Sequence, residues 1–161
     1  MTEQGAPIPD SPTVSEIEGF LTYQVSILAK LIDRRTIRLL SENFGLKLAE
    51  WRVLAQLSNQ SPNTVRSLAQ RMRMDRADVS RAAAALIARG YVERRQDEAD
   101  ARSALFLVTP AGLARYQEVL PSRIAENRRM DALLTEDEGE MFRSVIDRLT
   151  EALSEDPHEQ Y

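Results

Sequence analysis

The chain has 161 residues, with 21 basic and 25 acidic side chains, a formal net charge of −4, one histidine and no cysteine. This length suits one domain with extensions, and the lack of cysteine excludes disulfides, thiolate metal sites and a cysteine-based redox sensor. No apolar run approaches the ~20 residues that a membrane-spanning helix needs, and the first residues show no secretion signal. We therefore expect a cytoplasmic protein without a membrane partner. His158 lies in a polar tail, so we expect no metal and no cofactor.

The N-terminal part of the chain predicts a tail followed by one long helix. Three prolines lie among small and polar residues in 1–12, which we expect to be disordered. A helical pattern begins near Thr13 or Ser15 and continues to about Asn43, where Gly45 follows as a stop. Apolar side chains recur at helical spacing at Ile17, Phe20, Leu21, Leu28, Leu31, Ile32 and Leu39. This stripe predicts a helix with one buried face.

Three shorter helices follow. The first lies near Leu48–Asn59 and carries an apolar face around Trp51. The next begins at Thr64, which is a good N-cap. The third is capped by Asp75 and ended by Gly90.

A hairpin and two more helices complete the pattern. Residues 91–96 and 103–108 read as two strands joined by a tip too polar to be buried. Thr109 followed by proline is a strong helix start, and we expect Pro121 to interrupt and kink that helix. The capping box Thr135–Glu138 opens a last amphipathic helix.

This order of elements predicts a mainly α fold with a small β-wing (α+β), namely a winged helix-turn-helix with N- and C-terminal dimerisation helices. The terminal helices have apolar stripes but flank a domain that can form its own core. A second copy of the chain would cover these stripes; the alternative is that they pack only on their own domain. We divide the chain into a tail (1–12), a dimerisation helix (13–45), a winged helix-turn-helix lobe (46–109), C-terminal dimerisation helices (110–154) and a polar tail (155–161).

Charge is distributed unevenly along the chain. Residues 61–103 hold nine arginines, no lysine and six acids, a net charge of +3, whereas the remainder has a net charge of −7. A local basic face in an acidic protein favours double-stranded DNA as a partner. The candidate DNA-binding residues are Ser61, Thr64, Arg66, Arg76, Ala77, Ser80, Arg81, Arg94, Arg95, Asp100 and Arg102.

The helix from Asp75 to Arg89 is the expected recognition helix. Guanidinium groups pair with guanine acceptors, small side chains meet thymine methyls, and hydroxyls suit phosphates or base edges. At the hairpin tip, Arg102 could enter a minor groove while Asp100 holds its guanidinium in position. The alternatives are an alanine-rich surface helix with solvated arginines and, at the tip, an ion pair of little energetic consequence.

The same residues resemble the MarR family of transcriptional regulators. The resemblance covers roughly residues 15–153. It is carried in order by Trp51-Arg52-Val53-Leu54, Leu68-Ala69, Asp75–Arg81, the segment LIARGYVERR, Asp100-x-Arg102 and Leu107-x-Thr109-x-x-Gly112. It implies a triangular homodimer with a winged lobe at each corner. It also implies that the dimer binds a near-palindromic operator, and we expect it to act as a repressor. Arg76 and Asp78 depart from the small hydroxyl residues common in the family, so the operator sequence does not carry over.

The resemblance also implies that a small aromatic or anionic effector releases the protein from its operator. The effector would bind in a pocket between the dimerisation helices and the winged lobe. The candidate ligand-binding residues are Phe20, Tyr23, Arg38, Trp51, Arg52 and Tyr116. Aromatic residues at helical spacing are also ordinary core residues, which is the competing interpretation.

We therefore predict a homodimeric, sequence-specific DNA-binding transcriptional regulator. The alternative is a winged-helix protein-interaction module without specific DNA binding, although such a module has no need of nine arginines in one segment. An enzyme is not expected, because the sequence has no glycine-rich phosphate loop, no nucleophile elbow and no cysteine.

Overall fold

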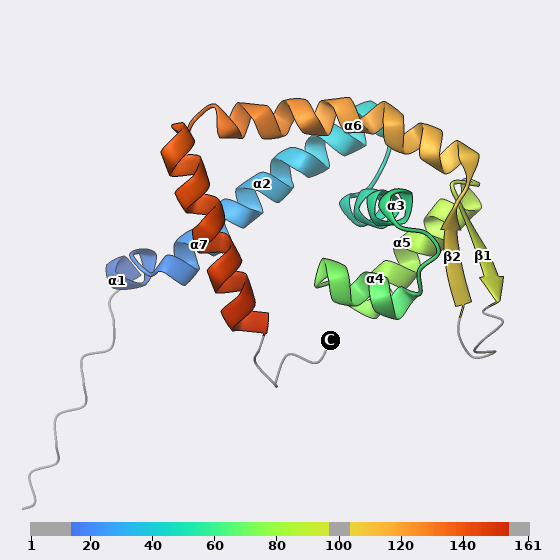
Figure 1. Ribbon diagram of the computed structural model, residues 1–161, viewed down its shortest axis with the longest axis horizontal. Helices are drawn as coiled ribbons and strands as arrows, with labels where there is room; N and C mark the ends of the chain where they lie inside the picture. Colours follow the sequence, from blue (N-terminus) through green and yellow to red (C-terminus); the bar gives the residue numbers. More distant parts are fainter. Residues whose placement is uncertain (1–13, 97–103, 155–161) are drawn as a thin grey trace, which may run out of the picture.

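The computed structural model describes residues 14–96 and 104–154. Its elements are α1 (Val14–Glu18), α2 (Leu21–Phe44), α3 (Leu48–Asn59), α4 (Val65–Met72), α5 (Arg76–Ala88), β1 (Val92–Gln96), β2 (Ala104–Val108), α6 (Pro110–Asp131) and α7 (Glu136–Ser154). Helices α3, α4 and α5 and the antiparallel β1–β2 hairpin form one lobe, from which α2 and α6 extend toward α7 (Figure 1). The mainly helical fold with a small wing is the predicted one.

Helix boundaries follow from capping groups that the sequence predicts. Thr64, Asp75 and Thr109 each accept a hydrogen bond from a backbone N–H of the helix that follows, at 3.1, 2.6 and 3.0 Å. These bonds satisfy donors that a helix start leaves unpaired. Gly45 and Gly90 have φ angles of 59° and 72°, in the left-handed region where glycine has no steric penalty. The predicted helix starts and stops around the lobe are therefore confirmed.

The hydrophobic core lies mainly in the lobe. Its buried side chains come from α3, α4, α5 and the hairpin, with contributions from α2, the α2–α3 connection and α6. They are Leu40, Leu46, Trp51, Val53, Leu54, Leu57, Leu68, Ala69, Val79, Ala82, Ala83, Leu86, Val92, Phe106 and Val119. The lobe can therefore hold its candidate site residues on a rigid support.

Two expectations about the long helices are wrong. The first helix is not continuous, because Gly19 and Phe20 separate α1 from α2. Their N–H groups bond to carbonyls three residues earlier, at 3.1 and 3.0 Å, and Phe20 has an extended backbone. Glycine's low helix propensity favours a break here. Pro121, in contrast, does not interrupt α6, which continues from Pro110 to Asp131, and only the kink expected at this proline stays a prediction. A proline removes one backbone hydrogen bond, and the flanking turns retain theirs.

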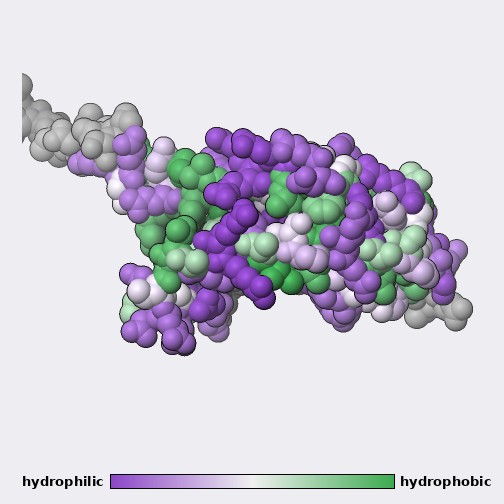
Figure 2. Space-filling model, turned by 90° about the horizontal axis from the view of Figure 1, so that it is seen from above, coloured by the Kyte–Doolittle hydropathy of each residue, from purple (hydrophilic) through white to green (hydrophobic). Residues whose placement is uncertain are grey.

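The terminal helices expose much of their apolar surface. Large apolar side chains with more than a third of their surface exposed include Ile17, Phe20, Leu21, Val25, Leu28 and Leu31 on the N-terminal side and Met141, Phe142, Ile146, Leu149 and Leu153 on α7. Figure 2 shows hydrophobic side chains at the molecular surface at the end where α2 and α7 lie. Among the residues described, no helix is long and apolar enough to cross a membrane.

Candidate nucleic-acid interface

Helix α5 presents one face to the core and the opposite face to solvent. The buried side chains are Val79, Ala82, Ala83 and Leu86, and the exposed ones include Arg76, Ala77, Ser80, Arg81 and Ala84. At 3.6 residues per turn, the small side chains occupy the middle of the exposed face and the two arginines flank it. Such a face allows the helix backbone to approach a groove closely, while guanidinium groups extend to base edges.

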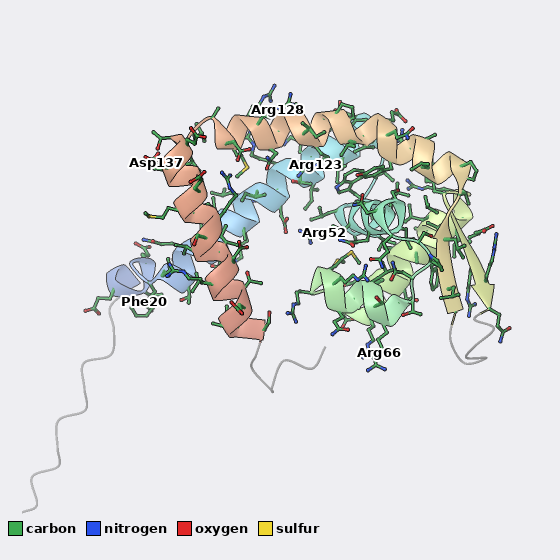
Figure 3. All side chains as sticks on the ribbon, viewed as in Figure 1. Phe20, Arg52, Arg66, Arg123, Arg128 and Asp137 are labelled. Carbon is green, nitrogen blue, oxygen red and sulfur yellow. The ribbon has the colours of Figure 1, made fainter. Side chains whose placement is uncertain are left out.

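The start of α4 contributes both structural and exposed polar groups. The Ser61 hydroxyl oxygen accepts a hydrogen bond from the backbone N–H of Val108, at 3.3 Å, and the Thr64 oxygen caps α4. Each of these oxygens therefore already has a structural partner. Arg66 is exposed and projects from α4 away from the lobe (Figure 3). Of the three candidates in this segment, Arg66 extends furthest into solvent.

Asn63 fixes α4 relative to the wing, a role that the sequence reasoning did not identify. Its backbone exchanges two hydrogen bonds with Phe106 of β2, at 3.0 and 2.8 Å. Its side-chain amide donates to the carbonyl of Gln60 at 2.6 Å and accepts from the Ser67 hydroxyl at 3.1 Å. The loop before α4 is thus attached to the hairpin, and this fixes the start of the helix that carries Arg66 relative to β2.

The two arginines of β1 leave the hairpin in opposite directions. Arg94 lies opposite Phe106 and Arg95 opposite Leu105 in the antiparallel register. Since side chains alternate between the faces of a strand, these neighbouring arginines lie on different faces. Arg95 pairs with Glu93 at 2.5 Å. The sequence grouped the two arginines together, but the pleat separates them. The predicted wing residues Asp100 and Arg102 lie outside the described residues.

One further acidic residue belongs to this surface. Asp78, in the first turn of α5, forms an ion pair with Arg81, and both side chains are largely exposed. From the sequence, Asp78 was noted as a departure from the residues common in the family, and its acidic side chain also suits the first turn of a helix. Its three-residue spacing from Arg81 was the signal for a direct contact.

The six candidate ligand-binding residues do not come together within one chain. Trp51 stacks on Tyr116, with ring centroids 5.5 Å apart, and Trp51 belongs to the core. Phe20 is about half exposed at the start of α2, far from Arg52 on α3 (Figure 3). Tyr23 and Arg38 are exposed residues of α2. The aromatic residues therefore do not form a single pocket wall in this chain.

Arginines are concentrated where α2, α3 and α6 approach one another. Arg52 pairs with Asp33 of α2 at 2.8 Å, and Arg35 pairs with the buried Glu126 of α6 at 2.7 Å. Arg123 of α6 has a buried Nη1 atom with no hydrogen-bond partner among the described residues. It was missed from the sequence, although it follows Tyr116 by seven residues and so lies on the same helical face.

Two other arginines hold the C-terminal end of α2. Arg89, at the end of α5, donates to the carbonyl of Gly45 at 2.8 Å. It also lies 3.5 Å from the buried carboxylate of Glu50. Arg115 of α6 donates to the carbonyl of Phe44 and lies over its ring. Cations are favoured at a helix C-terminus. These contacts connect α2 directly to the end of α5.

The chain is similar to known transcriptional regulators in both sequence and fold. Residues 44–103 match the MarR family. An uncharacterized HTH-type transcriptional regulator of Bacillus subtilis, YxaD, is 30% identical over 108 residues, which are 67% of this chain and 76% of YxaD. A MarR-family transcriptional regulator from Silicibacter pomeroyi is 27% identical, with a TM-score of 0.74, over 92% of this chain and 100% of its own.

The fold similarity extends to a DNA complex. Sco3205, a MarR-family transcriptional regulator from Streptomyces coelicolor in complex with DNA, has a TM-score of 0.79 at 22% identity and covers 96% of each chain. These relatives are transcriptional regulators and not enzymes. The sequence match over the lobe and the agreement of nearly the whole fold identify this chain as a member of the MarR family of transcriptional regulators.

Proposed function

We propose that this protein is a sequence-specific DNA-binding repressor that acts as a homodimer on a near-palindromic operator. The observation that carries the proposal is the exposed face of α5, in which small side chains are flanked by Arg76 and Arg81. Helix α4, the end of β1 and the start of β2 lie on the side of the lobe opposite α6 (Figure 1). This arrangement suits α5 in a major groove, with α4 and the wing beside it.

The candidate residues divide into two chemical roles. Arg76 and Arg81 would read guanine acceptors, and Ala77 would contact a thymine methyl group. Arg66 and one of the two β1 arginines would contact phosphates, which position the protein but carry no sequence information. Ser61, Thr64, Ser80, Asp100 and Arg102 complete the proposed interface, with Arg102 in a minor groove and Asp100 beside it.

The proposed dimer interface consists of residues 13–45 and 110–154. Its support is the row of exposed apolar side chains on α2 and α7. Monomeric soluble proteins rarely expose apolar surface of this extent. Helix α7 buries only Gly139 within this chain, so nearly all its apolar side chains are available to a partner subunit. Two copies related by a twofold axis would present two α5 helices to successive half-sites.

The test of DNA binding is fluorescence anisotropy with DNA from upstream of the protein's own gene, against unrelated competitor DNA at near-physiological salt. We expect tight binding that resists competitor, with two chains per site. Arg102→Ala should weaken operator binding with little change in melting temperature. Binding no tighter than to competitor, together with a retained protein partner, would favour the interaction-module alternative.

The test of the dimer is sedimentation of a Phe142→Glu/Leu149→Glu variant. We expect a monomer with a folded lobe and much weaker operator binding. Glu151→Lys, at an exposed polar position of the same helix, is the matched control and should remain dimeric. A double variant that still sediments as a dimer would place the interface elsewhere.

We propose further that a small aromatic or anionic effector releases the operator. The support is the buried Nη1 of Arg123 together with Arg52, because both offer guanidinium donors to an anion near α2. The Arg89 and Arg115 contacts would transmit a shift of α2 to α5. Salicylate is a suitable probe: it should weaken operator binding in the wild type, and Arg123→Gln should reduce this response. Operator affinity that is independent of salicylate and of related aromatic acids would contradict the effector proposal.

A further inference from the structure

Asp78 places a carboxylate on the flank of the exposed face of α5. It occupies the first turn of the helix, and its carboxylate pairs with the Arg81 guanidinium one turn later. The Arg81 and Asp78 side chains are 70% and 53% exposed, so neither is held by the core. The helix start does not depend on Asp78 for its cap, because Asp75 already accepts the Ala77 N–H at 2.6 Å.

Stability does not explain this pair. An exposed ion pair at three-residue spacing contributes little to folding, since water screens the charges. A carboxylate on a DNA-facing helix also repels phosphates, so it weakens binding to any duplex. A residue that reduces general affinity is useful only if it improves the choice between sequences.

The pair has a different effect on an arginine that reads bases. A guanidinium offers five N–H donors in a planar fork, and guanine N7 and O6 accept two of them side by side. A carboxylate bonded to another part of the fork restricts the rotamers of the side chain and fixes the plane of the donors. A phosphate contact needs no such orientation, because phosphate oxygens accept from many directions.

We propose that Asp78 is a positioning residue that directs Arg81 to guanine and lowers the affinity of the protein for non-operator DNA. This inference rests on the proposed function above. It assigns sequence discrimination to the Asp78–Arg81 pair as a unit. Without the carboxylate, Arg81 would turn to the nearest phosphate.

The experiment begins with selection of wild-type binding sites from a randomised duplex pool. Affinities are then measured for the selected duplex, for its single-base-pair substitutions and for unrelated DNA, over a range of salt concentrations. The proteins are wild type, Asp78→Asn, Arg81→Ala and the double variant. Asp78→Asn keeps nearly the same shape and removes the charge. Melting temperatures are recorded in parallel, so that a loss of folding is detected directly.

We expect one G·C pair at which wild type discriminates by about tenfold or more. Asp78→Asn should lose most of that discrimination, bind unrelated DNA more tightly, and show a salt slope larger by about one unit. Arg81→Ala should lose discrimination at the same base pair, and the double variant should resemble Arg81→Ala, because the two residues act together.

Glu93→Gln is the matched control, since Glu93 pairs with Arg95 on β1 and its removal also deletes one negative charge from the lobe. It should tighten binding to all duplexes by a similar factor. If Asp78→Asn does the same and leaves discrimination intact, Asp78 acts only as a charge and the proposal is wrong. If wild type selects no consensus at all, specific DNA binding itself fails, which is a distinct outcome.

Discussion

Gly112→Ala tests the packing of α6 against the wing. Helix propensity alone predicts that this substitution stabilises the protein, whereas the close packing predicts that it destabilises the protein. Gly112 lies in the first turn of α6, where alanine normally stabilises a helix by up to about 1 kcal/mol over glycine. In this structure, however, a Cβ atom at Gly112 would lie 2.0 Å from the carbonyl oxygen of Tyr91 and 3.0 Å from Cγ2 of Val108. The obstacle is backbone, so it cannot turn aside as a flexible side chain can.

The size of the expected loss of stability follows from the backbone groups that the new Cβ atom would displace. The Tyr91 carbonyl accepts the Thr109 N–H at 3.1 Å, at the junction of the wing and α6. A shift of more than an ångström would separate these groups and displace the start of β1. Overpacking of this kind destabilises by about 1–3 kcal/mol, and propensity offsets part of it, so we expect a net loss of about 2 kcal/mol. For a protein of this size, the melting temperature should fall by about 4–8 °C.

The assay is thermal and urea unfolding at a fixed protein concentration, because the stability of the proposed dimer would depend on concentration. Gly139→Ala in α7 is the matched control. Its Cβ would meet only the flexible end of Arg143, at 3.2 Å, so this substitution should be neutral or stabilising. If Gly112→Ala is as stable as wild type or more so, the close contact with Tyr91 does not exist and the reasoning is wrong.

Three further predictions concern single side chains. Arg89→Ala should destabilise the protein by about 2 kcal/mol in urea unfolding, because the buried Glu50 carboxylate loses its charged partner; Arg89→Lys should recover part of the loss. Hydrogen bonds from the backbone and hydroxyl of Thr135 lower the pKa of Glu138 from its ordinary 4.5, so the stability that Glu138 contributes is present above pH 4.5 and lost as pH falls through the lowered value. An NMR titration should show its midpoint rising in part in Thr135→Ala, which removes the hydroxyl and keeps the backbone N–H; an unchanged midpoint would exclude the hydroxyl bond as a cause. Arg66→Ala should reduce the salt slope of operator binding by about one unit with unchanged sequence preference, whereas an altered preference would show that Arg66 reads a base.

The parts of the fold that depend on a few consecutive residues were predictable from the sequence. Thr64, Asp75 and Thr109 cap helices because a hydroxyl or carboxylate at an N-cap reaches an N–H two or three residues later, whatever the rest of the chain does. Thr135 and Glu138 form their capping box for the same reason. The division of α5 into a buried and an exposed face likewise follows from its period.

The candidate site was predictable only in part. The exposed arginines of α5 were identified because apolar periodicity assigns them to the outer face. The face of the hairpin on which each β1 arginine lies was not identified. The register with β2 and the pleat of the strand send Arg94 and Arg95 to opposite faces. Nor did the sequence show that Phe20 and Trp51 lie far apart within one chain, with most of the 24-residue helix α2 between Phe20 and the lobe.

The sequence by itself determined the order of the helices, the wing and the basic character of the segment between residues 61 and 103, since these depend on local propensity, capping and charge. Tertiary structure decided which group each arginine contacts: Arg89 contacts Glu50, Arg52 contacts Asp33, and Arg115 contacts the end of α2. These contacts join residues far apart in the chain, and which residues meet depends on how the helices pack around the shared core. No pattern within a single helix contains that information.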